Sequence, residues 1–298
     1  MFDVVIVGAG PAGLSAALIL GRCRRRVLIC DTGKQRNAHS QALHGFLTRD
    51  GVAPGEFLRL GREQLCTYNT LEFREIEVID AAHNDNSFQI TLEDGTYVTS
   101  RKLLLATGVV DELPNIEGIS AFYGRSVYHC PYCDGWEVRD TPLAVYGKGE
   151  QGSRLALELT LWSRDLVLCT DGPAELSEKD LRRLTRNDIG VREERIARLE
   201  GSGGQLERIV FTNGEAFPRQ AMFISTQERQ HSDLPQKLGT TFTRHVAVHT
   251  GEYEETNVPG LFVAGDASRR VQLAIVAAAE GAEAAFAINT ELLKEDLA

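Results

Sequence analysis

Apolar runs that end in glycine turns recur along the chain and predict buried strands of a parallel sheet. The first run, residues 3–7, enters a turn at Gly8, and residues 14–20 then follow the apolar pattern of a helix. A second apolar run, residues 26–30, ends at Asp31. Strand, glycine turn, helix and strand in this order predict the opening β-α-β unit of a Rossmann-type sheet.

The same order of elements returns in the second half of the chain. The apolar residues 143–146 enter a second glycine loop, residues 147–152, which is followed by a helical run and an apolar strand at 153–163 and 166–169. Two such openings predict an α/β protein with two Rossmann-like dinucleotide-binding domains.

Further elements are predicted by alternating polarity and by turn residues. They are, in chain order, a hairpin of residues 87–92 and 96–98, a buried strand at 102–108, a hairpin of residues 206–212 and 215–217, a strand at 260–266 and an alanine-rich helix at 273–289. The last strand and helix would complete the first sheet. We therefore expect a first domain of residues 1–114 and 248–298, with a second domain, residues 115–247, inserted into it.

Composition and charge narrow the class of partner. The 298-residue chain carries a net charge of −10, which argues against nucleic acid as a partner because phosphate binding needs a positive surface. Its longest apolar runs are too short for a membrane span, and its first residues have the pattern of a strand and not of a signal peptide. We expect a cytoplasmic protein. The six cysteines are irregularly spaced and indicate no structural disulfide framework.

The first glycine loop has the residues that a dinucleotide requires. Gly8 permits the tight turn, Gly10 lets the backbone approach a pyrophosphate, and Gly13 allows close packing of helix on strand. The start of the helix supplies amide donors for the phosphates, and Asp31 stands where an acid bonds a ribose hydroxyl. The predicted binding residues here are Gly8, Gly10, Pro11, Ala12, Gly13 and Asp31.

This loop alone does not distinguish FAD from NAD. Two later turns resemble the distal FAD contacts of flavoproteins with two dinucleotide folds. That resemblance implies that Asp266 bonds the ribityl or pyrophosphate region, the alternative being a helix cap. It also implies that the start of the last helix lies against the flavin ring, where the helix dipole favours the reduced form. The residues concerned are Ala106, Thr107, Gly108, Gly265, Asp266, Gln272, Leu273 and Ala274.

Cys130 and Cys133 form a Cys-x-x-Cys motif, and Asp134 follows at once. Such a motif is found in zinc sites and in redox disulfides, and it also arises by chance. A zinc site would need two further Cys or His ligands at suitable spacing, so we predict no metal. Redox chemistry needs one thiolate to attack a disulfide and a second thiol to resolve the mixed disulfide, which this pair provides.

The segment from His129 to Gly135, placed before the second glycine loop, resembles the low-molecular-weight thioredoxin reductases, and the likeness extends over nearly the whole chain. In that family the two domains rotate against each other between two orientations. The resemblance implies a homodimer in which Cys133 faces FAD as the charge-transfer thiolate. It further implies that Cys130 attacks the disulfide of a thioredoxin-like protein and that Asp134 is the acid–base group.

Relatives that oxidise small dithiols often carry histidine at the position of Asp134. The aspartate therefore favours a disulfide reductase over a dithiol oxidase that uses oxygen. A flavin-binding redox sensor without turnover is a third alternative, and Asp134 acting only as a helix cap is also left open.

The second glycine loop departs from the NADPH-using members of the family. In those proteins a His-Arg-Arg cluster after the next strand holds the 2′-phosphate, whereas this chain has Asp171 there. A carboxylate would repel that phosphate by about 1 kcal/mol or more at contact distance. Glu150, inside the loop, is also unfavourable near a pyrophosphate, and residues 224–227 lack the usual glycine-rich turn.

These departures predict a donor other than standard NADPH. Some thioredoxin reductase-like flavoenzymes are linked to ferredoxin, and we favour that donor here. NADPH held by other contacts, and NADH with Asp171 on its ribose diol, are the alternatives. Because ferredoxins are acidic, basic residues would have to dock one. The candidates are Arg22, Arg24, Arg25, Arg26, Arg269 and Arg270.

Overall fold

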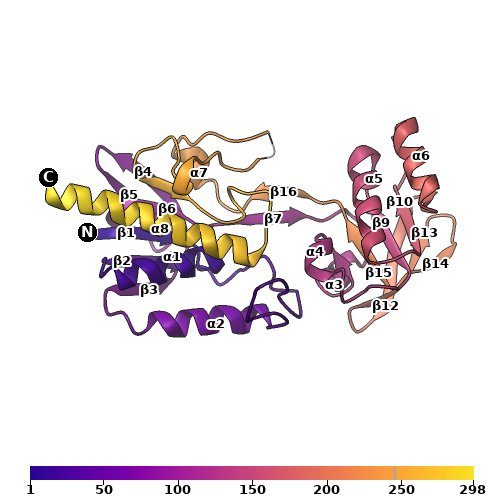
Figure 1. Cartoon of the computed structure of the whole chain (residues 1–298), viewed down its shortest axis with the longest axis horizontal. Helices are drawn as coiled ribbons and strands as arrows, with labels where there is room; N and C mark the ends of the chain where they lie inside the picture. The colour runs from indigo at the N-terminus through magenta and orange to yellow at the C-terminus, as the bar shows by residue number, and fades with distance from the viewer. Residues whose placement is uncertain (245) are drawn as a thin grey trace. The chain divides into compact units, whose positions relative to one another are not determined.

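The computed structural model describes residues 1–244 and 246–298, and these form two compact units (Figure 1). The first unit comprises residues 1–38, 45–110 and 228–298, and the second comprises residues 39–44 and 111–227. Strands β7 (Val109–Glu112) and β16 (Gln227–Gln230), which carry the chain between the units, pair with each other.

The remaining elements of the first unit are β1 (Phe2–Val7), α1 (Pro11–Arg22), β2 (Val27–Asp31), α2 (Pro54–Leu65), β3 (Leu71–Glu75), β4 (Val78–Asn84), β5 (Ser87–Leu92), β6 (Tyr97–Leu105), α7 (Leu234–Lys237), the 3-10 helix η2 (Glu252–Glu254), β17 (Leu261–Val263) and α8 (Ala274–Leu297). Its seven-stranded sheet has the order β3-β2-β1-β6-β5-β4, and β17 also pairs with β6. Strands β3, β2, β1, β6 and β17 are parallel, and β4, β5 and β6 form an antiparallel meander.

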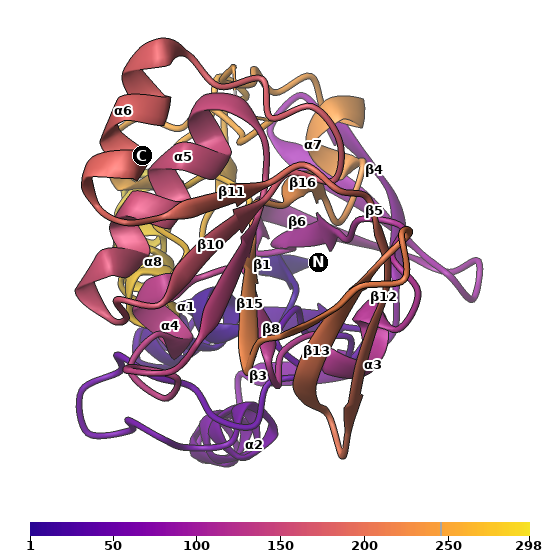
Figure 2. The same ribbon diagram turned by 90° about the vertical axis from the view of Figure 1, so that its right-hand side faces the viewer.

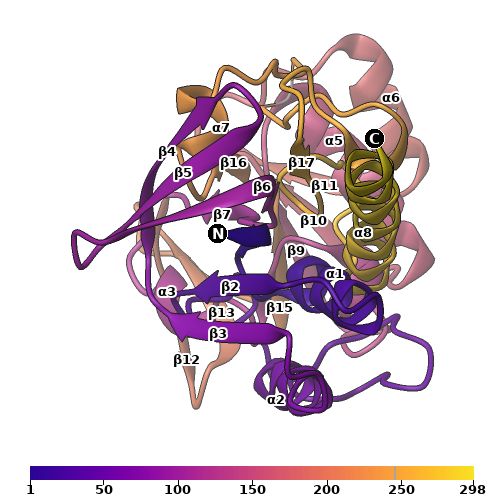
Figure 3. The ribbon, with the colours of Figure 1, turned by 90° about the vertical axis from the view of Figure 1, so that its left-hand side faces the viewer.

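Helices α1 and α8 lie side by side, as Figure 3 shows. Helix α1 begins with Pro11 after the N-cap residue Gly10, a position at which proline costs no hydrogen bond. A Cβ atom on Gly281 of α8 would lie 2.0 Å from the carbonyl oxygen of Ala12. The two helices therefore touch backbone to backbone, which the many small residues of α8 permit.

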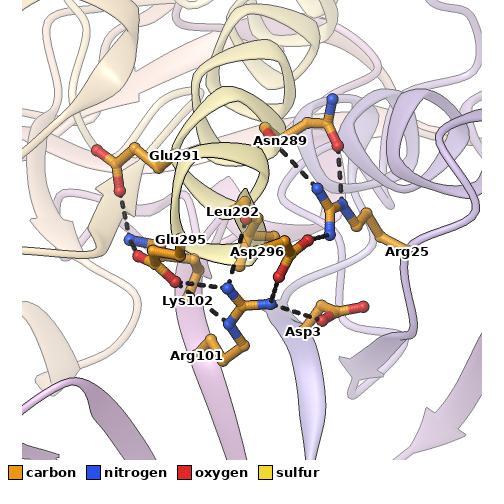
Figure 4. A network of polar contacts seen from close by, with 9 residues as sticks. All are labelled: Asp3, Arg25, Arg101, Lys102, Asn289, Glu291, Leu292, Glu295 and Asp296. Atoms are coloured by element: carbon orange, nitrogen blue, oxygen red, sulfur yellow. Dashed lines mark hydrogen bonds and ion pairs between the residues drawn. The ribbon is translucent and has the colours of Figure 1, made fainter. Parts of the chain in front are cut away.

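The last turns of α8 are held by ion pairs (Figure 4). Asp296 lies 2.6 Å from Arg25 and 2.7 Å from Arg101, so it joins the helix end to the segment after α1 and to β6. The apolar pattern predicted that this helix ends at Asn289. It continues to Leu297 because its polar last turns find cationic partners on the sheet.

The elements of the second unit are α3 (Ile119–Phe122), β8 (Val127–Tyr128), α4 (Pro131–Asp134), β9 (Leu143–Tyr146), α5 (Gly149–Glu158), the 3-10 helix η1 (Leu159–Leu161), β10 (Leu166–Cys169), α6 (Glu178–Arg186), β11 (Gly190–Arg192), β12 (Ile196–Ser202), β13 (Gln205–Phe211), β14 (Ala216–Pro218) and β15 (Ala221–Ile224). Its parallel sheet has the order β11-β10-β9-β15-β8, and β12, β13 and β14 form a separate antiparallel sheet. Figure 2 shows α5 and α6 together alongside the parallel strands.

The α/β class and both β-α-β openings are confirmed, and so are the two hairpins. Besides the longer α8, a second element differs from its prediction. The strands expected at 96–98 and 102–108 are a single strand, β6, which pairs with β5 at one end and with β1 and β17 at the other.

The two units differ from the expected domains at three segments. Residues 111–114 belong to the second unit and not to the first. Residues 228–247 belong to the first unit and not to the inserted one, because Leu234 and Val248 are fully buried in one apolar core with strands β5 and β6. Residues 39–44 belong to the second unit although the chain on both sides belongs to the first. This short segment packs there because His39 lies against Gly124, a residue without a side chain.

Candidate functional site

The first glycine loop joins β1 to α1 and lies against the turn after β6. A Cβ atom on Gly8 would lie 2.3 Å from the carbonyl oxygen of Ala106, and one on Gly13 would lie 1.9 Å from the carbonyl oxygen of Gly8. A Cβ atom on Gly10 would meet nothing within 4 Å. The loop is therefore packed tightly on the protein side and open at the beginning of α1, where Pro11 and Ala12 follow.

Asp31, at the end of β2, turns its carboxylate toward this loop. Its Oδ1 accepts a hydrogen bond of 2.9 Å from the amide of Ala9. Its Oδ2 accepts one of 3.1 Å from the amide of Gly33 and one of 2.7 Å from Arg62. The acid that the sequence predicted for a ribose hydroxyl is thus placed beside the glycine loop and fixed in orientation.

The turn after β6 carries a buried hydroxyl that lacks a bond. Thr107 Oγ1 has no hydrogen-bond partner among residues 1–244 and 246–298. Its neighbour Gly108 has a φ of +67°, and a Cβ atom there would meet nothing within 4 Å. Buried polar groups in native proteins are nearly always hydrogen-bonded, so an orphan hydroxyl beside an open glycine loop fits a polar ligand that completes it.

Arg36 gathers the remaining predicted contacts of the first unit. It donates to Asp266 Oδ2 over 2.9 Å and to Gln272 Oε1 over 2.6 Å, and it also pairs with Glu228 over 3.1 Å. The N-cap of α8 is Leu273, so Asp266 does not cap that helix. The predicted residues before and at the start of α8 are therefore brought together by an arginine that no pattern in the sequence singled out.

Gly265, just before Asp266, is held by a buried acid on α8. Its amide donates to Glu280 over 2.8 Å, and Glu280 also pairs with Arg269. Burial, with a smaller contribution from the nearby Glu254, raises the pKa of Glu280 to about 7, while the hydrogen bond from Gly265 and the charge of Arg269 oppose them. An isolated glutamate in an alanine-rich helix gives no sequence signal for this role, and sequence analysis missed it.

In the second unit, Cys130 and Cys133 are joined in a disulfide at the start of α4. Cys130 is the N-cap of this short helix, and its Sγ accepts a hydrogen bond of 3.1 Å from the amide of Cys133. The side chains of Tyr132 and Trp136 beside it are 67% and 65% exposed. The predicted pair is therefore a formed disulfide on a turn with exposed aromatic neighbours.

Asp134 has an unusual carboxyl group. Burial and, to a smaller extent, the negative charge of Glu137 raise its pKa to about 7, while His44 opposes them. A carboxyl that titrates near neutral pH can donate and accept a proton with similar ease, which suits a general acid–base. Sequence analysis predicted Asp134 but missed Glu137 and His44, since an acid three residues on and a histidine ninety residues earlier form no recognisable motif.

A second polar chain reaches the residue before Cys130. The hydroxyl of Tyr123 donates to Asp111 over 2.8 Å and lies 2.9 Å from Nδ1 of His129. Because the hydroxyl hydrogen points to Asp111, Nδ1 of His129 is the donor in the second bond. The chain positions the imidazole next to the disulfide, and sequence analysis gave His129 no role beyond its place in the motif.

The second glycine loop is packed like the first but is closed by its own chain. A Cβ atom on Gly152 would lie 2.6 Å from the carbonyl carbon of Gly147. The amide of Gly149, which corresponds to Gly10, donates over 2.9 Å to the carbonyl of Ala174. The amide of Ala174 in turn donates to Glu193 over 2.8 Å.

Asp171, just after β10, is held by the start of β12. Its Oδ1 accepts a hydrogen bond of 2.7 Å from the amide of Ile196, the first residue of β12. The next amide, that of Gly172, donates over 2.9 Å to the carbonyl of Glu193. Ser225 lies in the segment that lacks the glycine-rich turn usual in the family. A Cβ atom on Gly147 would lie 3.3 Å from the Cβ atom of Ser225. The segment after β10 is thus bound to the β11–β12 connection.

Two of the arginines considered for docking have internal partners. Arg25 pairs with Asp296 over 2.6 Å, and Arg269 pairs with two buried acids, Glu254 and Glu280, which are 1% and 6% exposed. Their charges are neutralised within the first unit. Neither is suited to attract an acidic partner.

In the part of the chain that the structure describes, no helix combines the length and the apolar character needed to cross a bilayer.

Comparison with known proteins agrees with these features. Residues 2–281 match the family model described as pyridine nucleotide-disulphide oxidoreductase. A protein named "Probable thioredoxin reductase" from Arthroderma benhamiae is 30% identical over 331 residues, which cover 99% of this chain and 81% of the relative. The crystal structure of HlmI is 37% identical, covers 99% of this chain and 94% of that one, and superimposes with a TM-score of 0.94.

A third relative is the atypical thioredoxin reductase TRi of Desulfovibrio vulgaris. It is 30% identical, the match covers 99% of both chains, and the TM-score is 0.55. The family implies a flavin cofactor, and the open first loop, the orphan Thr107 hydroxyl and the fixed Asp31 carboxylate fit one. The chain belongs to the pyridine nucleotide-disulphide oxidoreductases and is a flavoprotein oxidoreductase of thioredoxin reductase type.

Proposed function

We propose that the protein is an FAD-dependent reductase that passes two electrons through the Cys130–Cys133 pair to a thioredoxin-like protein, with a donor other than standard NADPH. The observation that carries the reductase is the formed disulfide next to Asp134, whose pKa lies near 7. A dithiol and a group that handles protons at neutral pH are the two parts that disulfide exchange needs.

The first unit would hold FAD with the residues predicted for it. Gly8, Gly10 and Gly13 would let the backbone approach the pyrophosphate, while Asp31 would take the adenosine ribose and Asp266 the ribityl region. Thr107 would gain the hydrogen bond that it lacks. When bound, FAD would supply the two electrons that reduce the disulfide.

The reduced pair would then act on the partner. The thiolate of Cys130 attacks one sulfur of the partner disulfide, a bond forms between these two sulfurs, and the partner disulfide breaks. Asp134 gives its proton to the leaving sulfur, a contribution of about 10²–10⁴-fold for a well-placed acid. Cys133 then attacks the sulfur of Cys130, so that the Cys130–Cys133 disulfide forms again and the second partner thiol is released.

The donor is proposed from the second glycine loop. The Gly149 amide, which a pyrophosphate would need, is already bonded to Ala174, and Asp171 adds a negative charge at the place of the 2′-phosphate. A protein donor of ferredoxin type would need no nucleotide site. Lys148, an exposed cation inside this loop, is the observation that favours the alternative, an NAD(P)H donor.

The reductase is tested without reference to its donor. The enzyme reduced chemically under anaerobic conditions with two electrons per active site should convert about one oxidised thioredoxin per active site, and Cys130→Ser and Cys133→Ser should convert none. Cys130→Ser should keep the thiolate-to-flavin absorbance and Cys133→Ser should lose it; the reverse pattern exchanges the two roles. Rapid oxygen uptake with small dithiols and no thioredoxin turnover would show a dithiol oxidase instead, and inertness toward both substrates would show a sensor.

A further inference from the structure

An ion pair stands next to the acid–base group of the disulfide. Nε2 of His44 lies 3.4 Å from Oε1 of Glu137, and the two side chains are 19% and 37% exposed. Glu137 lies one helical turn after Asp134, just beyond α4. The pair therefore brings one negative and one positive charge to the surroundings of the Asp134 carboxyl.

The two partners come from different parts of the chain. Glu137 is in the segment that carries the disulfide, whereas His44 ends the short segment 39–44 that joins the second unit from outside its continuous sequence. That segment packs closely on the backbone of the second unit, since a Cβ atom on Gly124 would lie 2.9 Å from the carbonyl carbon of His39. The segment thus brings the imidazole of His44 to Glu137.

We propose that the His44–Glu137 pair sets the protonation state of Asp134, so that both are positioning residues for disulfide exchange that act through this carboxyl. The proposal rests on the proposed function only for its use in exchange; the electrostatic coupling itself requires no turnover. It assigns a role to a histidine that the disulfide motif does not contain.

The direction of each influence follows from its charge. A like charge disfavours the ionised carboxyl and an opposite charge favours it. Glu137 raises the pKa of Asp134 and protonated His44 lowers it, with Glu137 the larger of the two. Burial adds to the effect of Glu137, and together they bring the carboxyl to about 7.

The other titratable group around this carboxyl is Tyr128, in the strand β8 before the disulfide. Its hydroxyl donates to the carbonyl of Arg125. Burial raises the pKa of Tyr128, and Asp134 and Glu137 raise it further, so the phenol stays neutral at the pH at which Asp134 titrates. Tyr128 therefore adds no charge beside Asp134 at that pH.

The test measures Asp134 directly in the oxidised, FAD-loaded full chain. Aspartate is labelled with ¹³C at the carboxyl, the Asp134 signal is assigned by its loss in Asp134→Asn, and its pH titration is followed. We expect Glu137→Gln to lower the titration midpoint by about one pH unit and His44→Gln to raise it by a smaller amount. His39→Gln, in the same segment but without the ion pair, is the matched control and should leave the midpoint unchanged.

A merely structural role predicts a different pattern. If the pair only held the segment in place, both variants would move the midpoint in the same direction or not at all, and either result overturns the proposal. The double variant Glu137→Gln/His44→Gln should return part of the way toward the native midpoint. This comparison keeps the test decisive if one single variant is poorly folded, which the flavin absorbance spectrum would reveal.

The pH profile of the exchange step separates this proposal from the reductase itself. The rate at which the chemically reduced enzyme is oxidised by thioredoxin should follow the same midpoint shifts in each variant. If thioredoxin is not a substrate but the ¹³C midpoints move in opposite directions, the coupling stands and the proposed substrate is wrong. If thioredoxin turns over and the midpoints do not move, the coupling is wrong.

Discussion

The two glycine loops share the same glycine spacing but differ in the surroundings of their second glycine. Gly10 in the first loop faces space that an added Cβ atom would leave free of contacts within 4 Å. Gly149 in the second loop has its amide bonded to Ala174 over 2.9 Å. The acids that follow also differ, since Asp31 accepts a hydrogen bond from the amide of Ala9 in its own loop, whereas Asp171 accepts one from the amide of Ile196 in β12.

This difference shows which part of the motif carries which information. The first and third glycines of each loop are enforced by close packing of backbone on backbone, at Gly8 and Gly13 as at Gly147 and Gly152. They predict the turn. Whether a phosphate can bind depends on the second glycine and on the segment after the next strand, and of the two loops only the first leaves the space at its second glycine open.

The largest expected effect comes from filling the open position of the first loop. Gly10 has a φ of −72°, which any residue can adopt, so Gly10→Val should leave the apo fold intact. The side chain would occupy the space of the pyrophosphate and should weaken FAD binding on the order of a hundredfold, equal to about 2.7 kcal/mol. Flavin content after gel filtration and titration of the apo protein with FAD measure this.

The matched change in the second loop should behave in the opposite way. Gly149 has a φ of +53°, so Gly149→Val should strain the backbone and destabilise the second unit by roughly 1–3 kcal/mol without reducing FAD affinity. Equal loss of FAD in both variants would contradict the distinction between the loops.

A smaller effect concerns the disulfide turn of the second unit. The pKa of Asp134 is raised from its ordinary value near 4 to about 7, so the fold disfavours the ionised form. The protonated carboxyl of Asp134 contributes its full stabilisation below pH 4, and this stabilisation is lost as the pH rises toward 7. Asp134→Asn should therefore stabilise the oxidised protein by about 1–2 kcal/mol at pH 8 and by little at pH 4.

Urea unfolding followed by tryptophan fluorescence measures this, because the two tryptophans of the chain, Trp136 and Trp162, are both in the second unit. A difference in the free energy of unfolding between native protein and variant that stays constant from pH 4 to pH 8 would show that the pKa of Asp134 is not raised.

The smallest expected effect concerns NADPH affinity. It separates the influence of the Asp171 charge from that of the Gly149–Ala174 hydrogen bond in the second loop. Asp171→Ala removes the negative charge but leaves the Gly149–Ala174 bond in place. If closure excludes NADPH, the variant should gain less than tenfold in NADPH affinity, which is under about 1.4 kcal/mol. Isothermal titration with NADPH measures this. A gain well above tenfold would mean that charge alone had excluded the nucleotide.

The features that were predictable from sequence are those encoded by neighbouring residues. The glycine loops, the dithiol and the strands before them depend on local spacing, and all were found where expected. The extent of α8 was not predictable, because its last turns depend on Arg25 and Arg101, far away in the chain. The return of the chain to the first unit near residue 228 depends likewise on burial of Leu234 in a distant core.

The same reason explains which site residues were missed. Arg36, Glu280 and His44 act through partners that lie many positions away, and none of them belongs to a motif. For the second loop, the sequence raised doubt about NADPH through the charge of Asp171, and that doubt stays a prediction. The hydrogen bond from Gly149 to the carbonyl of Ala174 could not be predicted, because every residue has a backbone carbonyl and the residue types do not show which one accepts.

The central claim is that the first loop serves a flavin while the second no longer serves its donor. Anaerobic reduction of the FAD-loaded protein, followed at the flavin absorbance in parallel with NADPH, NADH and reduced ferredoxin, tests it most directly. The account predicts rapid bleaching by ferredoxin and slow or no bleaching by either nucleotide at micromolar concentration. Rapid bleaching by micromolar NADPH, with none by ferredoxin, would contradict it.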